Sequence, residues 1–232
     1  MVLPFMAVAQ EVEEQIMTMT LFKIKQGHSA QFIDGVKKYK ECYTENEGVN
    51  EWNFWSRVQG EGTVYGVTSF MDKWAEMDET DTSGKDCYNI VVNFIMPHVE
   101  SVNYDMAKTL PEWSKKTAPA ETKLVWATYY KVGDAGVFSD VIKEVVSTMK
   151  DVEGDSRAYW YRFIGGDRDN ADYMVSSTYG SYAELDIDRD SPYEMYVKAK
   201  GEKKANSLEN MWKSADVESW SYIWEYKPEM SK

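Results

Sequence analysis

The sequence predicts an α+β fold built from two copies of one unit with the element order βαββαβ. Three observations support this prediction. Short segments recur in the same order in both halves of the chain, each half contains the same succession of strand and helix patterns, and the strands carry large apolar side chains on both faces. We therefore expect two antiparallel sheets from one chain to pack against each other.

The recurring segments are collinear, with separations that drift from 105 to 118 residues. A period above about 100 residues is too long for a solenoid repeat and indicates two copies of one domain. We place the first copy at residues 11–118 and the second at 119–232. The matched pairs are 54–57 with 159–162, 74–78 with 182–186, 99–104 with 217–222, and 111–114 with 228–231.

Alternating and helical apolar spacing locates the elements of the first copy. Ser29 is a candidate helix N-cap, followed at helical spacing by Phe32, Val36 and Tyr39. A short helix around Trp74 precedes a longer one. The predicted strands are 17–25, 51–58, 63–70 and 101–108, and the predicted main helices are 29–43 and 87–98.

The second copy repeats this order after a linker at 110–122 that contains two prolines. The segment between its third and fourth strands is some ten residues longer, so its second helical region is expected to be enlarged. The predicted strands are 124–132, 157–164, 173–179 and 218–226, and the helices are 137–149 and a region within 192–212.

A βαββαβ unit of this kind is ferredoxin-like, with two helices covering one face of a four-stranded sheet. Since Phe54 and Trp55 point to opposite faces of one strand, the uncovered face also needs burial. With its tandem units and aromatic strands, the chain resembles the dimeric α+β barrel superfamily, including antibiotic-biosynthesis-type monooxygenases and NIPSNAP-like proteins. The resemblance implies that the two sheets form an intrachain α+β barrel. That superfamily includes oxygenases, isomerases, haem-degrading enzymes and non-enzymatic proteins, so it does not decide the activity.

The composition limits the classes of molecule that the protein is expected to bind. A net charge of −13 disfavours nucleic acid and anionic membranes, and no apolar run reaches the roughly 20 residues that span a bilayer. Nine Trp, sixteen Tyr and eight Phe can line a ligand cavity or an interface, or simply fill a bulky core. We expect a small-molecule ligand as partner, and homo-oligomerisation stays open.

The first ten residues resemble the end of a secretory signal peptide. An apolar run is followed by Ala7-Val8-Ala9, which places small residues at the −3 and −1 positions of a cleavage site before Gln10. The alternative is a packed or disordered N-terminal arm. The signal-peptide interpretation predicts a periplasmic or secreted protein.

The best candidate site is a Trp-x-Arg pattern that occurs in both copies. Trp55 with Arg57, and Trp160 with Arg162, are predicted to face the space between the sheets. An unpaired guanidinium is costly there, so it needs water, a carboxylate or an anionic ligand, and the neighbouring Trp can form one wall of a binding site.

The alternative is that these arginines pair with Asp105 or Glu225 on the last strands and have a structural role. In the ligand-binding interpretation, Asn53, Tyr104 and Tyr222 complete the site. No residue is assigned a catalytic role.

Metal and cofactor signals are weak. The acidic clusters at 167–172 and 186–190 suit Ca²⁺ only loosely, because they lack the glycine and distal glutamate of an EF-hand loop. His28 and His98 do not recur between the copies, and no phosphate-binding glycine loop or zinc spacing is present. We therefore expect no metal and no cofactor.

The only two cysteines, Cys42 and Cys87, fall at helix ends that lie at the same edge of the first unit. They are a candidate disulfide in an oxidising compartment, and the alternative is two partly buried thiols.

These observations give two hypotheses. The first is an exported barrel that binds a small aromatic or anionic molecule between its sheets, with cofactor-independent oxygenase or isomerase chemistry as the resemblance allows. The second is a non-enzymatic structural or interaction module with a filled aromatic core. A lumen of about 300 Å³ or more would favour the first.

Overall fold

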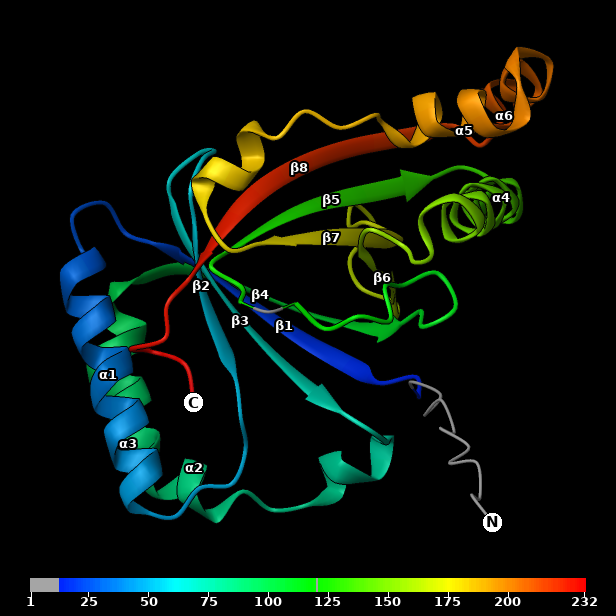
Figure 1. Ribbon diagram of the computed structural model, residues 1–232. Helices are drawn as coiled ribbons and strands as arrows, with labels where there is room; N and C mark the ends of the chain where they lie inside the picture. Colours follow the sequence, from blue (N-terminus) through cyan, green and yellow to red (C-terminus); the bar gives the residue numbers. More distant parts are fainter. Residues whose placement is uncertain (1–12, 120) are drawn as a thin grey trace, which may run out of the picture.

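The computed structural model describes residues 13–119 and 121–232 (Figure 1). The predicted signal-peptide segment, residues 1–10, lies outside the described residues.

Each half of the chain contributes four strands and the helices that cover them. The first half contains β1 (Ile16–Ile24), α1 (Ser29–Glu45), β2 (Asn53–Arg57), β3 (Thr63–Met71), η1 (Trp74–Asp78), α2 (Thr82–Asp86), α3 (Tyr88–Ile90) with its extensions η2 (Val91–Ile95) and η3 (Met96–His98), and β4 (Val99–Thr109). The second half contains β5 (Leu124–Val132), α4 (Ala135–Glu153), β6 (Tyr159–Phe163), β7 (Tyr173–Tyr179), η4 (Tyr182–Asp186), α5 (Pro192–Lys200), α6 (Glu202–Ser214) and β8 (Val217–Tyr226). The enlarged helical region of the second half is broken at Gly201, which adopts a φ of 82°.

The eight strands form one closed antiparallel barrel in the order β1-β3-β2-β8-β5-β7-β6-β4. Within each half the strands pair as in a ferredoxin-like sheet. The edges of the two sheets are then joined by the β2–β8 and β4–β6 ladders. This arrangement confirms the predicted α+β fold and intrachain barrel, and hydrogen bonds at both edges close it.

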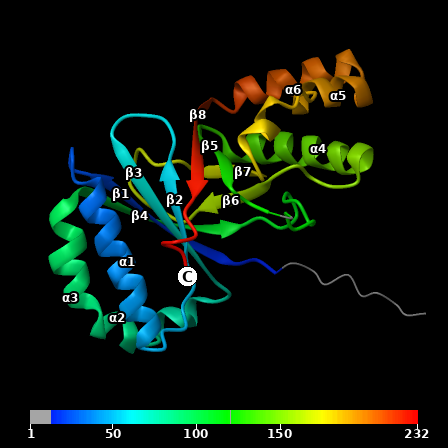
Figure 2. The same ribbon diagram turned by 60° about the vertical axis from the view of Figure 1, so that its left-hand side comes forward.

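The helices lie outside the barrel in two groups, one on each half (Figure 2). α1 and α3 cover the first sheet, where Phe32 and Val36 pack against Phe54 and Tyr65. α4 covers the second sheet, while α5 and α6 pack mainly on α4. The remaining apolar strand face points into the barrel, as the alternation of strand side chains requires.

The sequence accounts for the ends of α4 directly. Asp134 accepts hydrogen bonds from the backbone N–H groups of Gly136 and Val137, so it is the N-cap that satisfies otherwise free donors. Gly154 ends the helix with a φ of 86°, in the left-handed region that favours glycine.

The linker after β4 crosses onto the second half. Ser114 Oγ accepts a 2.8 Å hydrogen bond from the backbone N–H of Trp160 in β6. Trp113 packs edge-on against the Trp160 indole and stacks on Tyr173. The segment Pro111–Ser114 therefore covers the outer face of the sheet that it does not belong to.

The C-terminal segment makes the reciprocal crossing. Ser231 Oγ accepts a 2.8 Å hydrogen bond from the backbone N–H of Phe54 in β2. Met230 is buried in the core of the first half, and its carbonyl oxygen accepts a hydrogen bond from the indole of Trp52. The recurrence of Pro-Glu-x-Ser in the sequence is therefore a recurrence of structure, in which each half is covered by the tail of the other.

We predict that Ser114→Ala and Ser231→Ala each lower the free energy of unfolding by about 1–3 kcal/mol, because each leaves a buried backbone N–H without its acceptor. Urea unfolding checks this, with Ser219→Ala on the exposed face of β8 as the control. A change of less than 0.5 kcal/mol, roughly the size of an ordinary surface substitution, would contradict the assigned role of both serines.

Cys42 and Cys87 form a disulfide, with their Cα atoms 6.0 Å apart. Cys42 lies near the end of α1, and Cys87 follows α2 and is buried. The bond ties α1 to the segment that leads back to the sheet.

We predict that Cys42→Ala/Cys87→Ala costs about 3–4 kcal/mol in the chain-entropy model, because the bond closes a loop with a sequence separation of 45 residues. Thermal unfolding of the variant and of the parent, each with and without reductant, measures the effect. Reductant should destabilise only the parent. Reactive thiols in unfolded, unreduced parent protein would show that the bond does not form in solution.

Candidate functional site

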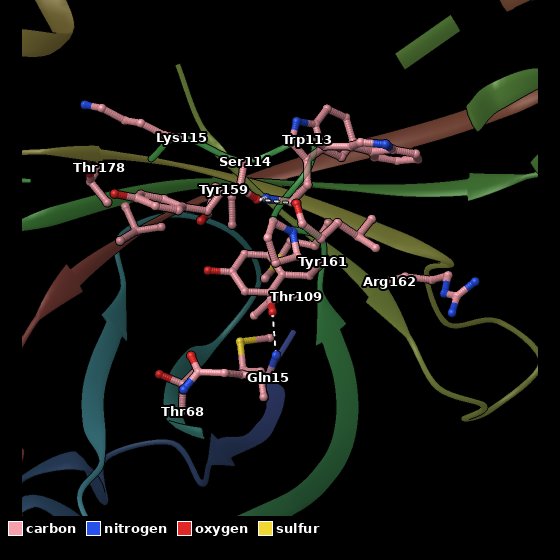
Figure 3. A pocket seen from close by; sticks show the side chains of 18 of the residues that line it. Gln15, Thr68, Thr109, Trp113, Ser114, Lys115, Tyr159, Tyr161, Arg162 and Thr178 are labelled. Carbon is pink, nitrogen blue, oxygen red and sulfur yellow. Dashed lines mark hydrogen bonds between the residues drawn. The ribbon is translucent and has the colours of Figure 1, made fainter. Parts of the chain in front are cut away.

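A cavity of about 1400 Å³ comprises the lumen of the barrel, which opens where β1, β2, β5 and β6 begin, and a continuation past the linker onto the outer face of the second sheet (Figure 3). This is well above the 300 Å³ or so at which small-molecule sites begin. Most of the exposed lining is apolar. The side chains that form the inner wall include Met17, Met19, Tyr129, Tyr161, Met174 and Trp224.

Aromatic contacts hold the wall of the lumen in place. Tyr129 stacks on Trp220 with ring centroids 5.9 Å apart, at an interplanar angle of 8°. Trp55 packs on Tyr226 at 5.2 Å, and its indole N–H donates a 3.0 Å hydrogen bond to Thr68 Oγ1. The Trp55 ring is therefore fixed both by packing and by a satisfied donor.

Four of the predicted site residues lie on the interior face, namely Asn53, Trp55, Arg57 and Tyr222. Asn53 and Trp55 line the cavity. Arg57 lies beyond its inner end, where its guanidinium is 4.7 Å from the centre of the Tyr222 ring.

Arg57 is satisfied mainly by the backbone of its own hairpin. Its Nη2 donates to the carbonyl oxygen of Glu61, while its buried Nε has no partner among the described residues. The carboxylate partners considered for the arginines bond elsewhere, because Asp105 accepts from two amides and Glu225 pairs with Lys227.

The face predicted for Trp160 and Arg162 is wrong. Trp160 is buried on the outer, helix-covered face, and Arg162 shares that face and is exposed. In the structure Trp160 is the equivalent of Phe54. Phe54 of β2 and Trp160 of β6 pair with equivalent positions of β3 and β7, and the backbone N–H of each donates a hydrogen bond to the serine of a crossing tail. The two Trp-x-Arg patterns are therefore one residue out of register, which reverses every side chain.

The interior position predicted for Tyr104 is also wrong, since its side chain is 52% exposed on the outer face. The pairing of β4 with β1 shifts by one residue between Lys23 and Ile24, whereas β8 pairs with β5 without a shift. This bulge adds a residue to β4 and turns the positions after it to the opposite face.

Asp105 is the buried carboxylate of the barrel interior, only 7% exposed. Its oxygens accept 2.6 Å hydrogen bonds from the side-chain amides of Asn103 and Asn170. Burial, assisted by the nearby charge of Asp167, raises the pKa of Asp105 above its ordinary value. The amide donors stabilise the charged form and partly offset this effect.

The interior phenols are uncharged at neutral pH. Burial raises the pKa of both Tyr129 and Tyr161, so each hydroxyl keeps its proton and can donate a hydrogen bond. Neither is suited to act as a general base near neutral pH.

We predict that the folded protein resists tyrosine ionisation until it unfolds in alkali. A pKa raised in the folded state contributes stability that is present below the unfolded value, near 10, and lost as pH rises through the folded value. Burial also raises the pKa of Tyr39, on α1, to about 12. Tyrosinate absorbance followed together with circular dichroism checks this. Denatured protein, titrating near pH 10, is the control, and full ionisation at pH 10 with the fold intact would contradict it.

Members of both acidic clusters have partners within the protein. Asp172 accepts from the backbone N–H of Val132, Asp190 pairs with Lys198, and Asp169 pairs with Lys131. Across residues 13–119 and 121–232, no group of three or more His, Cys, Asp and Glu side chains is placed to hold a metal ion.

Several lumen residues were not predicted from the sequence, chiefly Met19, Ala127, Tyr161 and Trp224. The sequence does contain a signal for them, because each lies two or four residues from other apolar residues of its own strand and therefore shares their face. Finding them requires the correct cross-strand register, which the repeat alone does not supply.

No family model matches the sequence, and no curated protein is similar to it. Solved structures do share the fold. A "putative monooxygenase" from Fusobacterium nucleatum is 14% identical, with 92% of this chain and 93% of that chain covered and a TM-score of 0.53. Another so described, from Lactobacillus acidophilus, is 13% identical, with 92% and 94% covered and a TM-score of 0.54. A heme-binding protein from Thermus thermophilus is 9% identical, with 93% and 92% covered and a TM-score of 0.51.

At these identities the likeness concerns the fold alone. Among the described residues, no helix combines the length and hydropathy needed to cross a membrane.

The residues present do not fit a haem held by an imidazole or a thiolate. The two histidines bond to each other outside the lumen, with their Nδ1 atoms 2.9 Å apart, and both cysteines are in the disulfide. The described side chains that line the cavity include no His or Cys.

Proposed function

We propose that this protein binds a small aromatic or anionic molecule in the lumen of its barrel. The observation that carries the proposal is the cavity of about 1400 Å³, whose inner part is walled by methionine and aromatic side chains of a closed barrel. A site of this kind gains affinity by removing apolar ligand surface from water, at roughly 25 cal/mol per Å² before the costs of binding are subtracted.

The volume argues against the alternative, a structural module with a filled aromatic core. Close-packed interiors leave few voids larger than a water molecule, so a cavity of this size that reaches into the barrel favours a binding site over a filled core. Cavity-lining Ala127 is small where a filled core would carry a larger side chain.

Oxygenase-type chemistry without a cofactor is a second candidate, and two of the similar structures are described as monooxygenases. The observation in its favour is Asp105, a buried carboxylate whose raised pKa suits proton transfer. Against it, Asp105 does not line the cavity, and the inner wall presents phenols instead. Binding is therefore the function that the geometry favours.

We further propose that the protein is exported to the periplasm or the cell exterior. The disulfide between Cys42 and Cys87 supports this, because such bonds persist mainly in oxidising compartments.

We predict that Ala127→Phe lowers the affinity for a neutral aromatic probe, N-phenyl-1-naphthylamine, by at least about tenfold, since a phenyl ring at this position occupies the lumen. A tenfold change corresponds to about 1.4 kcal/mol of binding free energy. Fluorescence titration measures the affinity.

Thr128→Phe is the matched control, because it adds a similar ring on the opposite face of the same strand. Circular dichroism establishes that both variants fold. If the parent does not bind the probe, or if both variants bind as the parent does, the lumen is not the binding site.

A further inference from the structure

The cavity has a charge opposite to that of the protein. Five of its charged lining residues are basic and three are acidic, although the whole chain has 39 acidic and 26 basic residues. The basic residues are Lys115, Lys116, Lys143, Lys150 and Arg162, and the acidic ones are Glu13, Glu14 and Glu112.

These cations belong to the outer part of the cavity, which continues past the linker onto the outer face of the second sheet. There the stacked rings of Trp113 and Tyr173 form an aromatic wall. Arg162 lies directly opposite Tyr173 in the β6–β7 ladder, and Lys143 adds a second cation from α4. In Figure 3 the Arg162 guanidinium points away from the lumen.

The charge of Arg162 is not balanced by the part of the chain that the structure describes. Arg162 is opposite Lys108 in the β4–β6 ladder, and like charges in opposed positions are destabilising. Lys108 is neutralised by Glu14 at 2.5 Å, whereas neither Arg162 nor Lys143 forms a salt bridge within residues 13–119 and 121–232. An anion at this place would supply the charge partner that Arg162 and Lys143 lack among the described residues.

We propose that the ligand is an amphiphile, with its apolar body in the lumen and its carboxylate, sulfonate or phosphate group held by Arg162 and Lys143. This inference rests on the proposed function and goes further, because it requires both chemical properties in one molecule and fixes its orientation. The lumen provides the apolar contacts, and the two cations provide charge-assisted hydrogen bonds at the outer end. It also gives Arg162 a role outside the barrel, at the end of the cavity opposite to Arg57.

Two fluorescent probes with the same rings test the proposal. 8-Anilinonaphthalene-1-sulfonate carries an anionic group, and N-phenyl-1-naphthylamine does not. We expect Lys143→Met/Arg162→Met to weaken binding of the sulfonate about tenfold and that of the neutral probe less than about twofold, as expected for the loss of one paired anionic group.

Arg168→Met/Lys203→Met is the matched control, because it removes the same charge from exposed positions that do not line the cavity. The control should leave both affinities unchanged. Thermal unfolding should show that the cavity variant is about as stable as the parent, since neither Arg162 nor Lys143 forms a salt bridge among the described residues that the substitutions would break.

The outcomes separate the inference from the function on which it rests. If the neutral probe binds in the lumen but the two double variants change the affinity for the sulfonate probe equally, the proposed orientation is wrong, whereas binding in the lumen is still supported. If Ala127→Phe does not weaken binding of the sulfonate probe, the aromatic part of the probe is not in the lumen and the inference is again wrong. If the parent binds neither probe, both proposals fail.

Discussion

The structure depends on the closure of the barrel at two short seams. The β2–β8 and β4–β6 ladders each align only three residue pairs, yet they join two four-stranded sheets into one ring without free edges. Unpaired edges would expose backbone donors and acceptors, and closure removes them. The crossing tails reinforce these seams, because Ser114 bonds to β6 and Ser231 bonds to β2, the short strand at each seam. Closure also separates an outer face for the helices from an inner face for the lumen.

Much of this organisation could be predicted from the sequence, because it depends on local patterns and on repetition. The alternation in β2 correctly placed Phe54 under the helices and Trp55 inside. The errors come from register, which no local pattern fixes. Trp160 was matched to Trp55 by residue type, whereas its hydrogen bonding matches it to Phe54. With a side-chain period of two, a slip of one residue moves a side chain through the sheet.

The candidate site was harder to predict than the fold, since it depends on contacts between segments that are distant in the sequence. Arg57 was correctly placed inside, but its main partner is the carbonyl oxygen of Glu61 in its own turn and not a carboxylate on another strand. The outer part of the cavity is formed by the linker, β6 and α4 together, and the sequence gives no sign that these elements meet. The repeated Trp-x-Arg pattern predicts Arg162 between the sheets, whereas Arg162 lies on the outer face of the second sheet.

The lumen exists because the two halves have diverged on their inner faces. Cross-strand pairing makes Ala107 of β4 equivalent to Trp224 of β8, and Gly66 of β3 equivalent to Met174 of β7. A Cβ atom on Gly66 would lie 3.3 Å from the Trp224 ring, so the small residue of β3 accommodates the large one of β8, two strands away in the barrel wall. Bulky residues at both positions of each pair would fill the barrel, and small ones at both would leave its wall poorly packed. At these two positions the first half carries the small residue and the second half the large one, and this departure from symmetry leaves the wall ordered and the space open.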